Sequence, residues 1–303
     1  MYQIIDVPDH VANLLEQTGT KPKFWFQGEN SVNYPFKEGR PGTGDDWSEK
    51  VASELCDLLG LPHAVYDLAI WRGKRGVVCP TFVPEGGRLV LGNELLAKVR
   101  SKYPEKQFFH VRQHTLRRVL AIVRNEHIRV PLGWDTQPGI TSAIDVFIGY
   151  LMLDAWIANQ DRHHENWALM VSPESAIHLA PTYDHASSLG SNETDENRKN
   201  RLTTRDAGRS MQRYVERARS AFYRSASSRT PMSPLDAFRE AGKVRQRAAR
   251  VWLESLERSS LESTKSIFDQ IPRDIISEVA IEFALKLLEL NRQRLLGLYE
   301  VLR

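Results

Sequence analysis

The feature that most constrains the fold is an apolar run followed directly by a polar segment. Residues 143–158 (AIDVFIGYLMLDAWIA) have the character of a buried helix, and Ser142 and Asp145 have the spacing of a capping box at its start. Because Asp145 and Asp154 interrupt the run, we do not expect it to span a membrane. The next residues, 159–166, read NQDRHHEN. Such a polar loop at the end of a buried helix indicates a functional site.

The N-terminal third has the pattern of a small β-rich unit. Residues 22–27 (PKFWFQ) and 31–37 (SVNYPFK) are rich in aromatic residues on either side of a turn, which predicts a β-hairpin. A helix is expected over 46–62, where apolar residues recur at helical spacing before a terminal Gly and Pro. Residues 64–71 and 76–83 predict two further strands around the turn RGKRG.

Beyond this unit the pattern becomes helical. Apolar residues recur at a spacing of three and four, and we expect helices over residues 107–125, 142–158, 235–258 and 273–300. The sequence therefore predicts an α+β, two-lobed protein. Residues 1–91 would form a small β-rich N-lobe and residues 92–303 a larger helical C-lobe.

Composition limits the classes of function. The chain has 303 residues, enough for two lobes, and its net charge of +3 does not argue for nucleic acid. Its two cysteines, Cys56 and Cys79, do not suggest a disulfide framework. The start of the chain, MYQIIDVPDH, lacks the basic head and apolar core of a secretion signal. We expect a cytoplasmic protein without a membrane partner.

One segment, residues 198–229, is strongly basic. It contains ten Lys and Arg residues against Asp206 and Glu216. It fits a solvated helix face, or a surface for an acidic partner, nucleotide phosphates or RNA. Its few aromatic residues are Tyr214, Phe222 and Tyr223, so direct nucleic-acid binding is not expected.

Three residues have the spacing of a phosphoryl-transfer site. Asn166 follows Asp161 by five positions, as the metal-binding asparagine follows the base aspartate in protein kinases. Asp184 comes after the short apolar stretch IHLAP and could supply the second metal ligand. Taken singly, each could be a surface acid, a helix cap or a turn residue. His163 could brace the loop through a backbone carbonyl, whereas His164 is expected to be solvated. No HExxH or cysteine pair supports zinc.

These residues resemble the signature of the HipA-like serine/threonine kinases. That signature is similar to N-x-D-x-H-x-x-N followed by L-x-P-x-Y-D, and here the two parts read NQDRHHEN (159–166) and LAPTYD (179–184). The similarity extends over most of residues 15–190. It implies a two-lobed protein-kinase-like fold, with Asp161 as the catalytic base, supported by His163. Asn166 and Asp184 would hold Mg²⁺.

The resemblance also implies how ATP would be bound. Lys37, at the end of the second hairpin strand, would contact the ATP phosphates. Glu49, early in the following helix, would pair with Lys37, although Glu54 is a rival for this role. The segment GTKPK would cover the phosphates through Gly19 and Lys23. The adenine would lie near Thr81, Phe82 and Val83.

The implied activity is an ATP- and magnesium-dependent protein serine/threonine kinase. Family precedent suggests the toxin of a bacterial toxin–antitoxin system that acts on an aminoacyl-tRNA synthetase. Full-length members carry an N-terminal subdomain ahead of the GTKPK position, so we expect a short, core-only member with a separate antitoxin or N-subdomain partner. The preceding LLEQTG contains no serine, so self-inactivation there is not expected. A small-molecule kinase, or a non-catalytic module that binds through residues 198–229, are the alternatives.

Overall fold

A mixed six-stranded sheet organises the N-terminal part of the protein. The computed structural model describes residues 1–11, 14–16, 23–28, 32–107 and 109–302. The strands lie in the order β1-β5-β6-β4-β3-β2. Their bounds are β1 Ile5–Asp6, β2 Leu14–Glu16, β3 Lys23–Gln27, β4 Asn33–Glu38, β5 Asp67–Trp71 and β6 Lys74–Val78, with a 3-10 turn at Asp9–Val11. The predicted hairpin is confirmed as the antiparallel pair β3–β4.

The register of this hairpin sorts its side chains between two faces. Phe24 lies opposite Phe36, and their rings pack with Trp71 in an apolar cluster on one face of the sheet. Lys23 lies opposite Lys37. Because directly opposed residues project from the same face and neighbours alternate, Lys23 and Lys37 share the other face.

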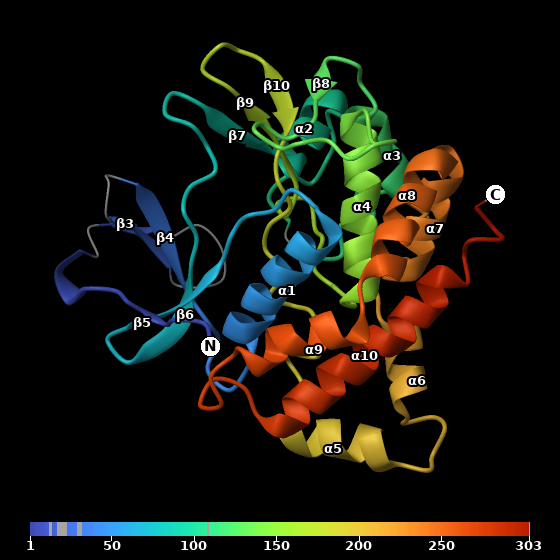
Figure 1. Ribbon diagram of the computed structural model, residues 1–303. Helices are drawn as coiled ribbons and strands as arrows, with labels where there is room; N and C mark the ends of the chain where they lie inside the picture. Colours follow the sequence, from blue (N-terminus) through green and yellow to red (C-terminus); the bar gives the residue numbers. More distant parts are fainter. Residues whose placement is uncertain (12–13, 17–22, 29–31, 108, 303) are drawn as a thin grey trace.

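Helix α1 (Asp45–Leu59) connects the sheet to the helical part of the molecule. It packs against β5 and β6 on one side and against α8 and α9 on the other (Figure 1). The helix ends at Gly60, which has a φ of 68° in the left-handed region that glycine adopts without strain. The predicted helix and its glycine stop are therefore confirmed.

A second sheet lies at the top of Figure 1, beside the helical part. Its order is β7-β9-β10-β8, with bounds β7 Arg88–Leu91, β8 Ile128–Arg129, β9 Ala168–Val171 and β10 Ile177–Leu179. β7 precedes the predicted lobe boundary at residue 91, yet it pairs with β9 from the later part of the chain. The boundary itself stays a prediction.

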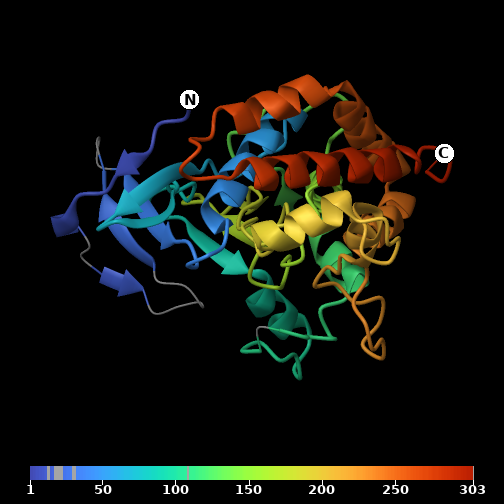
Figure 2. The same cartoon turned by 90° about the horizontal axis from the view of Figure 1, so that it is seen from below.

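Helix α4 (Ala143–Trp156) forms the centre of the helical part, and all its residues are buried. As predicted, the carboxylate of Asp145 accepts from the backbone N–H of Ser142 at its start. α3, α7, α8 and α10 contact α4, and α5 lies along α10 in both views (Figure 2). The remaining bounds are α2 Gly92–Val99, α3 Leu116–Val123, α5 Asp195–Thr203, α6 Met211–Arg217, α7 Pro234–Val244, α8 Gln246–Arg258, α9 Leu261–Asp269 and α10 Glu278–Leu296.

Two predicted helices were wrong in extent. The segment 107–125 is helical only from Leu116, because its first part forms turns, including His110 at a φ of 58°. The segment 235–258 is two helices that meet at Arg245, whose φ of −137° and ψ of 65° are not helical. The guanidinium of Arg245 reaches Asp145 at the start of α4, with Nε 2.7 Å from Oδ1. A long-range ion pair thus lies at the break between the two helices.

The predicted α+β class with a small β-rich lobe and a larger helical lobe is confirmed. None of the helices in the described ranges combines the length and apolar character that a membrane crossing requires.

Candidate active site

Lys37 lies between two carboxylates that come from distant parts of the chain. Its Nζ is 3.4 Å from Oε2 of Glu49 on α1, and it also donates a short hydrogen bond to the carboxylate of Asp184. Glu49 is fully buried. The predicted Lys37–Glu49 pair is therefore present, and the structure brings the proposed metal ligand Asp184 to the same ammonium.

The electrostatics of this cluster favour its charged state. Burial lowers the pKa of Lys37, but the nearby charges of Asp184 and Glu49 outweigh burial, so the pKa is raised above its usual value. Burial also opposes the charged form of Glu49, yet Lys37 and His185 hold the pKa of this carboxyl below its usual value. The three side chains thus form a preorganised ionic cluster.

Glu54, the rival partner for Lys37, is engaged elsewhere. Its Oε1 lies 2.7 Å from Nζ of Lys50, one helical turn earlier, and the same ammonium is 2.9 Å from Asp67. The structure therefore distinguishes two glutamates on α1 that the sequence left open.

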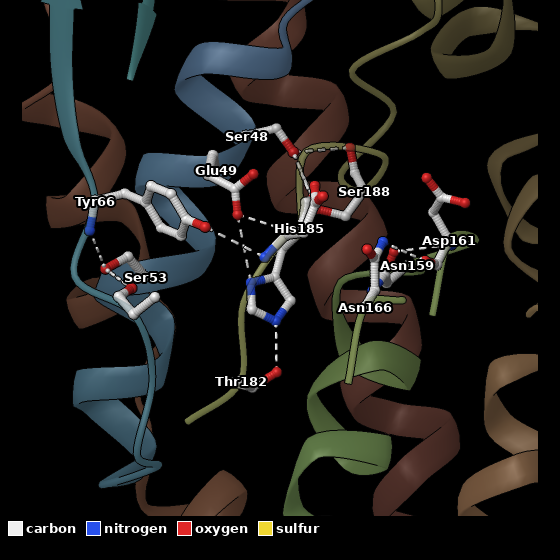
Figure 3. Close-up of polar contacts among 12 residues, drawn as sticks. Ser48, Glu49, Ser53, Tyr66, Asn159, Asp161, Asn166, Thr182, His185 and Ser188 are labelled. Atoms are coloured by element: carbon white, nitrogen blue, oxygen red, sulfur yellow. Dashed lines mark hydrogen bonds and ion pairs between the residues drawn. The ribbon is translucent and has the colours of Figure 1, made fainter. Parts of the chain in front are cut away.

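The second oxygen of Glu49 is bonded to the segment that follows Asp184. Oε1 accepts from the backbone N–H of His185 at 2.6 Å (Figure 3). The ring of His185 makes two further contacts. Its Nε2 lies 2.8 Å from Oγ1 of Thr182 and 3.3 Å from Nη2 of Arg162. Since arginine can only donate, Nε2 accepts from Arg162, and Nδ1 lies 3.6 Å from Glu49.

Asp184 has an unusual backbone conformation. Its φ of 60° lies in the left-handed region, which Asp and Asn tolerate better than most residues with a Cβ atom. Residues held in this region cluster at functional sites, where the surrounding structure compensates for the strain.

The predicted catalytic loop connects α4 to β9 and is held by its own amides. The backbone N–H of Asp161 donates to Oδ1 of Asn159 at 3.0 Å, and Nδ2 of Asn166 donates to the carbonyl of Asp161 at 2.7 Å (Figure 3). Ser187, shortly after Asp184, donates to Oδ2 of Asp161 at 3.5 Å. The loop therefore adjoins the segment that contains Asp184. Because the nitrogen of Asn166 is used, its side-chain oxygen is the atom that could bind a cation.

The sequence reasoning missed the residue that anchors this loop, Arg162. Its side chain is fully buried, with Nε 2.8 Å from Oδ2 and Nη2 2.7 Å from Oδ1 of Asp154, while Nη1 donates to the carbonyl of Asn166 at 2.9 Å. The signal was Asp154 itself, because an acid inside an apolar run needs a buried cationic partner.

The two histidines of the loop have different environments. Nδ1 of His163 accepts from the backbone N–H of Glu165 at 3.1 Å, and its Nε2 lies 4.0 Å from Oδ1 of Asp161. The expectation that His164 is solvated was wrong. Its ring is buried against Tyr103, whose hydroxyl lies 2.7 Å from Nδ1, and burial lowers the pKa of His164 to about 4.

An apolar region lies next to the Lys37 cluster. Val77 is opposite Lys37 in the register of β4 and β6, and it packs with Tyr66 and Cys79. Phe82 packs on this group. The centroid of its ring lies 6.0 Å from that of Tyr183, the residue before Asp184. Val83, next in the chain, is partly exposed, and its backbone N–H donates to the Thr81 hydroxyl at 3.3 Å.

The segment expected to cover the phosphates is described only at its end. Gly19 lies outside the described residues. Lys23 is the first residue of β3 and lies opposite Lys37. Burial raises the pKa of Glu165, and the charge of Lys23 opposes part of this rise. Lys23 therefore adds a second cation on the sheet face that carries Lys37.

The chemical types of the two predicted metal ligands are compatible with magnesium. In the described ranges no cluster of three His, Cys, Asp or Glu residues could enclose a metal ion. Asp184 and the side-chain oxygen of Asn166 supply hard oxygen donors. Mg²⁺ is commonly held by one or two protein oxygens together with waters and substrate phosphates, so a small donor set fits it.

Comparison with known proteins identifies the fold. No family model and no curated protein matches the chain. The proinflammatory kinase CtkA of Helicobacter pylori superposes with a TM-score of 0.76 and 20% identity, covering 99% of this chain and 98% of that chain. The chain has a HipA-like kinase fold. HipA of Shewanella oneidensis MR-1, solved with HipB and operator DNA, gives a TM-score of 0.61 and 13% identity over 95% of this chain and 67% of its own.

In this HipA-like kinase fold the predicted site residues come from separate elements. Lys37 is on β4, Glu49 on α1, Asp161 and Asn166 on the loop after α4, and Asp184 on the segment after β10. The sequence predicted these five residues, and their contacts are now described. Their roles in catalysis stay predictions.

Proposed function

We propose that the protein is an ATP- and Mg²⁺-dependent protein serine/threonine kinase. The observation that supports this most is the ionic cluster of Lys37, Glu49 and Asp184 beside a loop in which Asn166 holds the carbonyl of Asp161. An ion pair with a purely structural role would not need Asp161 and Asn166, five positions apart, beside it. This combination provides a cation for phosphates, oxygens for a metal and a base for an acceptor hydroxyl.

Each residue has a defined task in the proposed reaction. Phe82 and Val83 line the region for adenine, and Lys37, held by Glu49, binds phosphate oxygens. Lys23 and Gly19 belong to the segment proposed to cover the phosphates. Asn166 and Asp184 would hold Mg²⁺, which offsets negative charge on the phosphates when it is bound.

Asp161 acts on the acceptor. Its carboxylate orients the serine or threonine hydroxyl and accepts its proton as the hydroxyl oxygen bonds to the γ-phosphorus. The bond from that phosphorus to the β-phosphate oxygen breaks, and ADP leaves with the electron pair. His163, with Nε2 4.0 Å from Asp161, supports the orientation of this carboxylate.

Substitution of Asp161 tests the proposal. Asp161→Asn should abolish transfer from labelled ATP, while circular dichroism and the melting temperature stay close to wild type. Asp135→Asn is the matched control, because Asp135 is an exposed aspartate. Undiminished transfer by Asp161→Asn would remove the assigned role.

A protein partner is also proposed. The solved HipA complex contains HipB in a toxin–antitoxin system. We extend this to an antitoxin-type partner or separate N-subdomain protein for this chain, acting in the cytoplasm. An aminoacyl-tRNA synthetase is the first candidate substrate, and co-purification and mass spectrometry of phosphorylated lysate proteins test both points.

A further inference from the structure

A groove opens beside Asp161. It encloses about 200 Å³ and is formed by three segments that are distant in sequence. The catalytic loop supplies Gln160, Asp161 and His163, and the other two walls come from residues 109–114 and 219–231. The proposed base therefore lies in a lined groove.

The two outer walls carry charge of one sign. Residues 109–114 and 219–231 contain four Arg residues and no Asp or Glu: Arg112, Arg219, Arg224 and Arg229. Among the residues that line the groove, Arg219 is the permanently charged cation and Asp161 is the carboxylate. A peptide entering between these walls meets a positive potential.

Arg219 is held in place by its own loop. Its Nη1 donates to the carbonyl of Glu216 at 3.1 Å and to the carbonyl of Ala218 at 2.9 Å. Its side chain is exposed, and Nε and Nη2 make no hydrogen bond or ion pair within the described part of the chain. The guanidinium is thus positioned while keeping donors for a carboxylate.

The buried imidazole of His114 connects the two outer walls and contacts Trp167, which follows the catalytic loop. Nε2 of His114 accepts from Nε1 of Trp167 at 3.2 Å, and Nδ1 donates to the carbonyl of Ala221 at 3.1 Å. The backbone N–H of Tyr223 donates to the carbonyl of His114 at 3.0 Å, which joins the two outer walls directly. The groove is therefore preorganised, which lowers the cost of ordering on binding.

The basic character continues beyond the groove. A neighbouring cavity of about 450 Å³ is lined by Arg117, Arg124 and Arg224, and also by Glu240, whose Oε2 lies 3.8 Å from Nη1 of Arg224. It also contains Leu120 and the half-exposed Val244. A bound segment extending past Tyr223 would meet a surface with three Arg residues, one Glu and several apolar side chains.

We propose that this groove binds an acidic protein segment and presents its serine or threonine to Asp161, with Arg219 as a specificity-determining residue for a nearby Glu or Asp. This inference rests on the proposed kinase function and adds the substrate class. A protein segment fits better than RNA, because Tyr223 and His114 are buried and the exposed rings among the residues that line the groove are the adjacent Phe109 and His110.

Synthetic peptides test the inference directly. Wild-type protein with Mg²⁺ and labelled ATP is given peptides of equal length with one serine flanked by Glu, by Ala and Gln, or by Lys. We expect kcat/KM to be roughly tenfold higher for the acidic peptide than for the neutral one, and to fall as salt is raised.

Arg219→Glu should lower kcat/KM for the acidic peptide roughly tenfold and raise it for the basic peptide, because an attraction becomes a repulsion. Its affinity for ATP should not change. Arg250→Glu is the control with the same charge change, since Arg250 is exposed on α8 and lines none of the cavities described here. It should leave all three peptides unaffected.

The outcomes separate the two proposals. Transfer to all peptides without an acidic preference, or an unchanged preference in Arg219→Glu, overturns the inference and leaves the kinase function standing. If single-stranded RNA binds the groove and displaces the acidic peptide in an Arg219-dependent manner, the surface is an RNA site and the inference fails. Absence of transfer to any peptide and to the protein itself overturns both.

Discussion

At the scale of single residues, Lys37 carries the largest share of the proposed nucleotide binding. It is the cation shared by Glu49 and Asp184, and Glu49 is fully buried. Lys37→Met should lower phosphoryl transfer by roughly a hundredfold or more, because a preorganised charge on the phosphates is lost. It should also lower the free energy of unfolding by about 3–5 kcal/mol, since a buried carboxylate loses its partner. Single-turnover kinetics and urea denaturation measure the two effects.

A double variant separates stability from activity. In Lys37→Met with Glu49→Gln the neutral amide still accepts from the backbone N–H of His185, so most of the lost stability should return. Phosphoryl transfer should stay as low as in Lys37→Met. Recovery of transfer in the double variant would show that Lys37 has only a structural role.

At the scale of elements, the catalytic loop depends on an anchor beneath it. Arg162 joins Asp154 on α4 to the carbonyl of Asn166. Arg162→Lys keeps the charge but loses the planar fork, so the free energy of unfolding should fall by about 2 kcal/mol. Because Asp161 and Asn166 would shift, kcat should fall while the KM for ATP changes little. Equal losses in Arg250→Lys, at an exposed site, would contradict a positioning role.

The same loop shows what sequence can and cannot predict. Asp161 and Asn166 were found because their spacing is local and fixed by the loop. Arg162 was passed over as a charged loop residue, because its importance comes from burial against Asp154, which only the packing of α4 reveals. His164 was misjudged for the same reason, since Tyr103 covers it from a distant segment.

Helix boundaries failed where tertiary contacts interrupt a helical pattern. The apolar spacing of 235–258 is continuous, but the ion pair from Arg245 to Asp145 lies where α7 and α8 meet. Similarly, residues 109–114 form a wall of the groove instead of a helical turn. The hairpin β3–β4 and α1 were predicted well, because their signals are complete within each segment.

At the scale of the whole molecule, the contacts of His114 with distant segments make the stability of the fold depend on pH. Burial lowers its pKa from 6.5 to about 3, and Trp167 donates to the nitrogen that would be protonated. Between these pH values the unfolded chain binds a proton that the folded chain does not. The free energy of unfolding should therefore fall as pH falls from about 6.5, by up to about 1.4 kcal/mol per pH unit from this group.

His114→Gln should make this dependence shallower by up to one proton, measured by urea denaturation between pH 7 and pH 4.5. Its amide can still accept from Trp167 and donate to Ala221. His127→Gln is the control, because His127 is exposed. A slope that matches wild type in both variants would exclude His114 as the source.

The two contacts of Glu49 make the arrangement of the predicted site depend on one helix. Its two carboxylate oxygens reach different lobes, one toward Lys37 on the sheet and the other toward the backbone after Asp184. A rotation of α1 would therefore break the contact with Lys37 and the hydrogen bond from His185 together. The orientation of α1, which is fixed by its packing against β5, β6, α8 and α9, therefore determines whether Lys37 and the segment after Asp184 are held together.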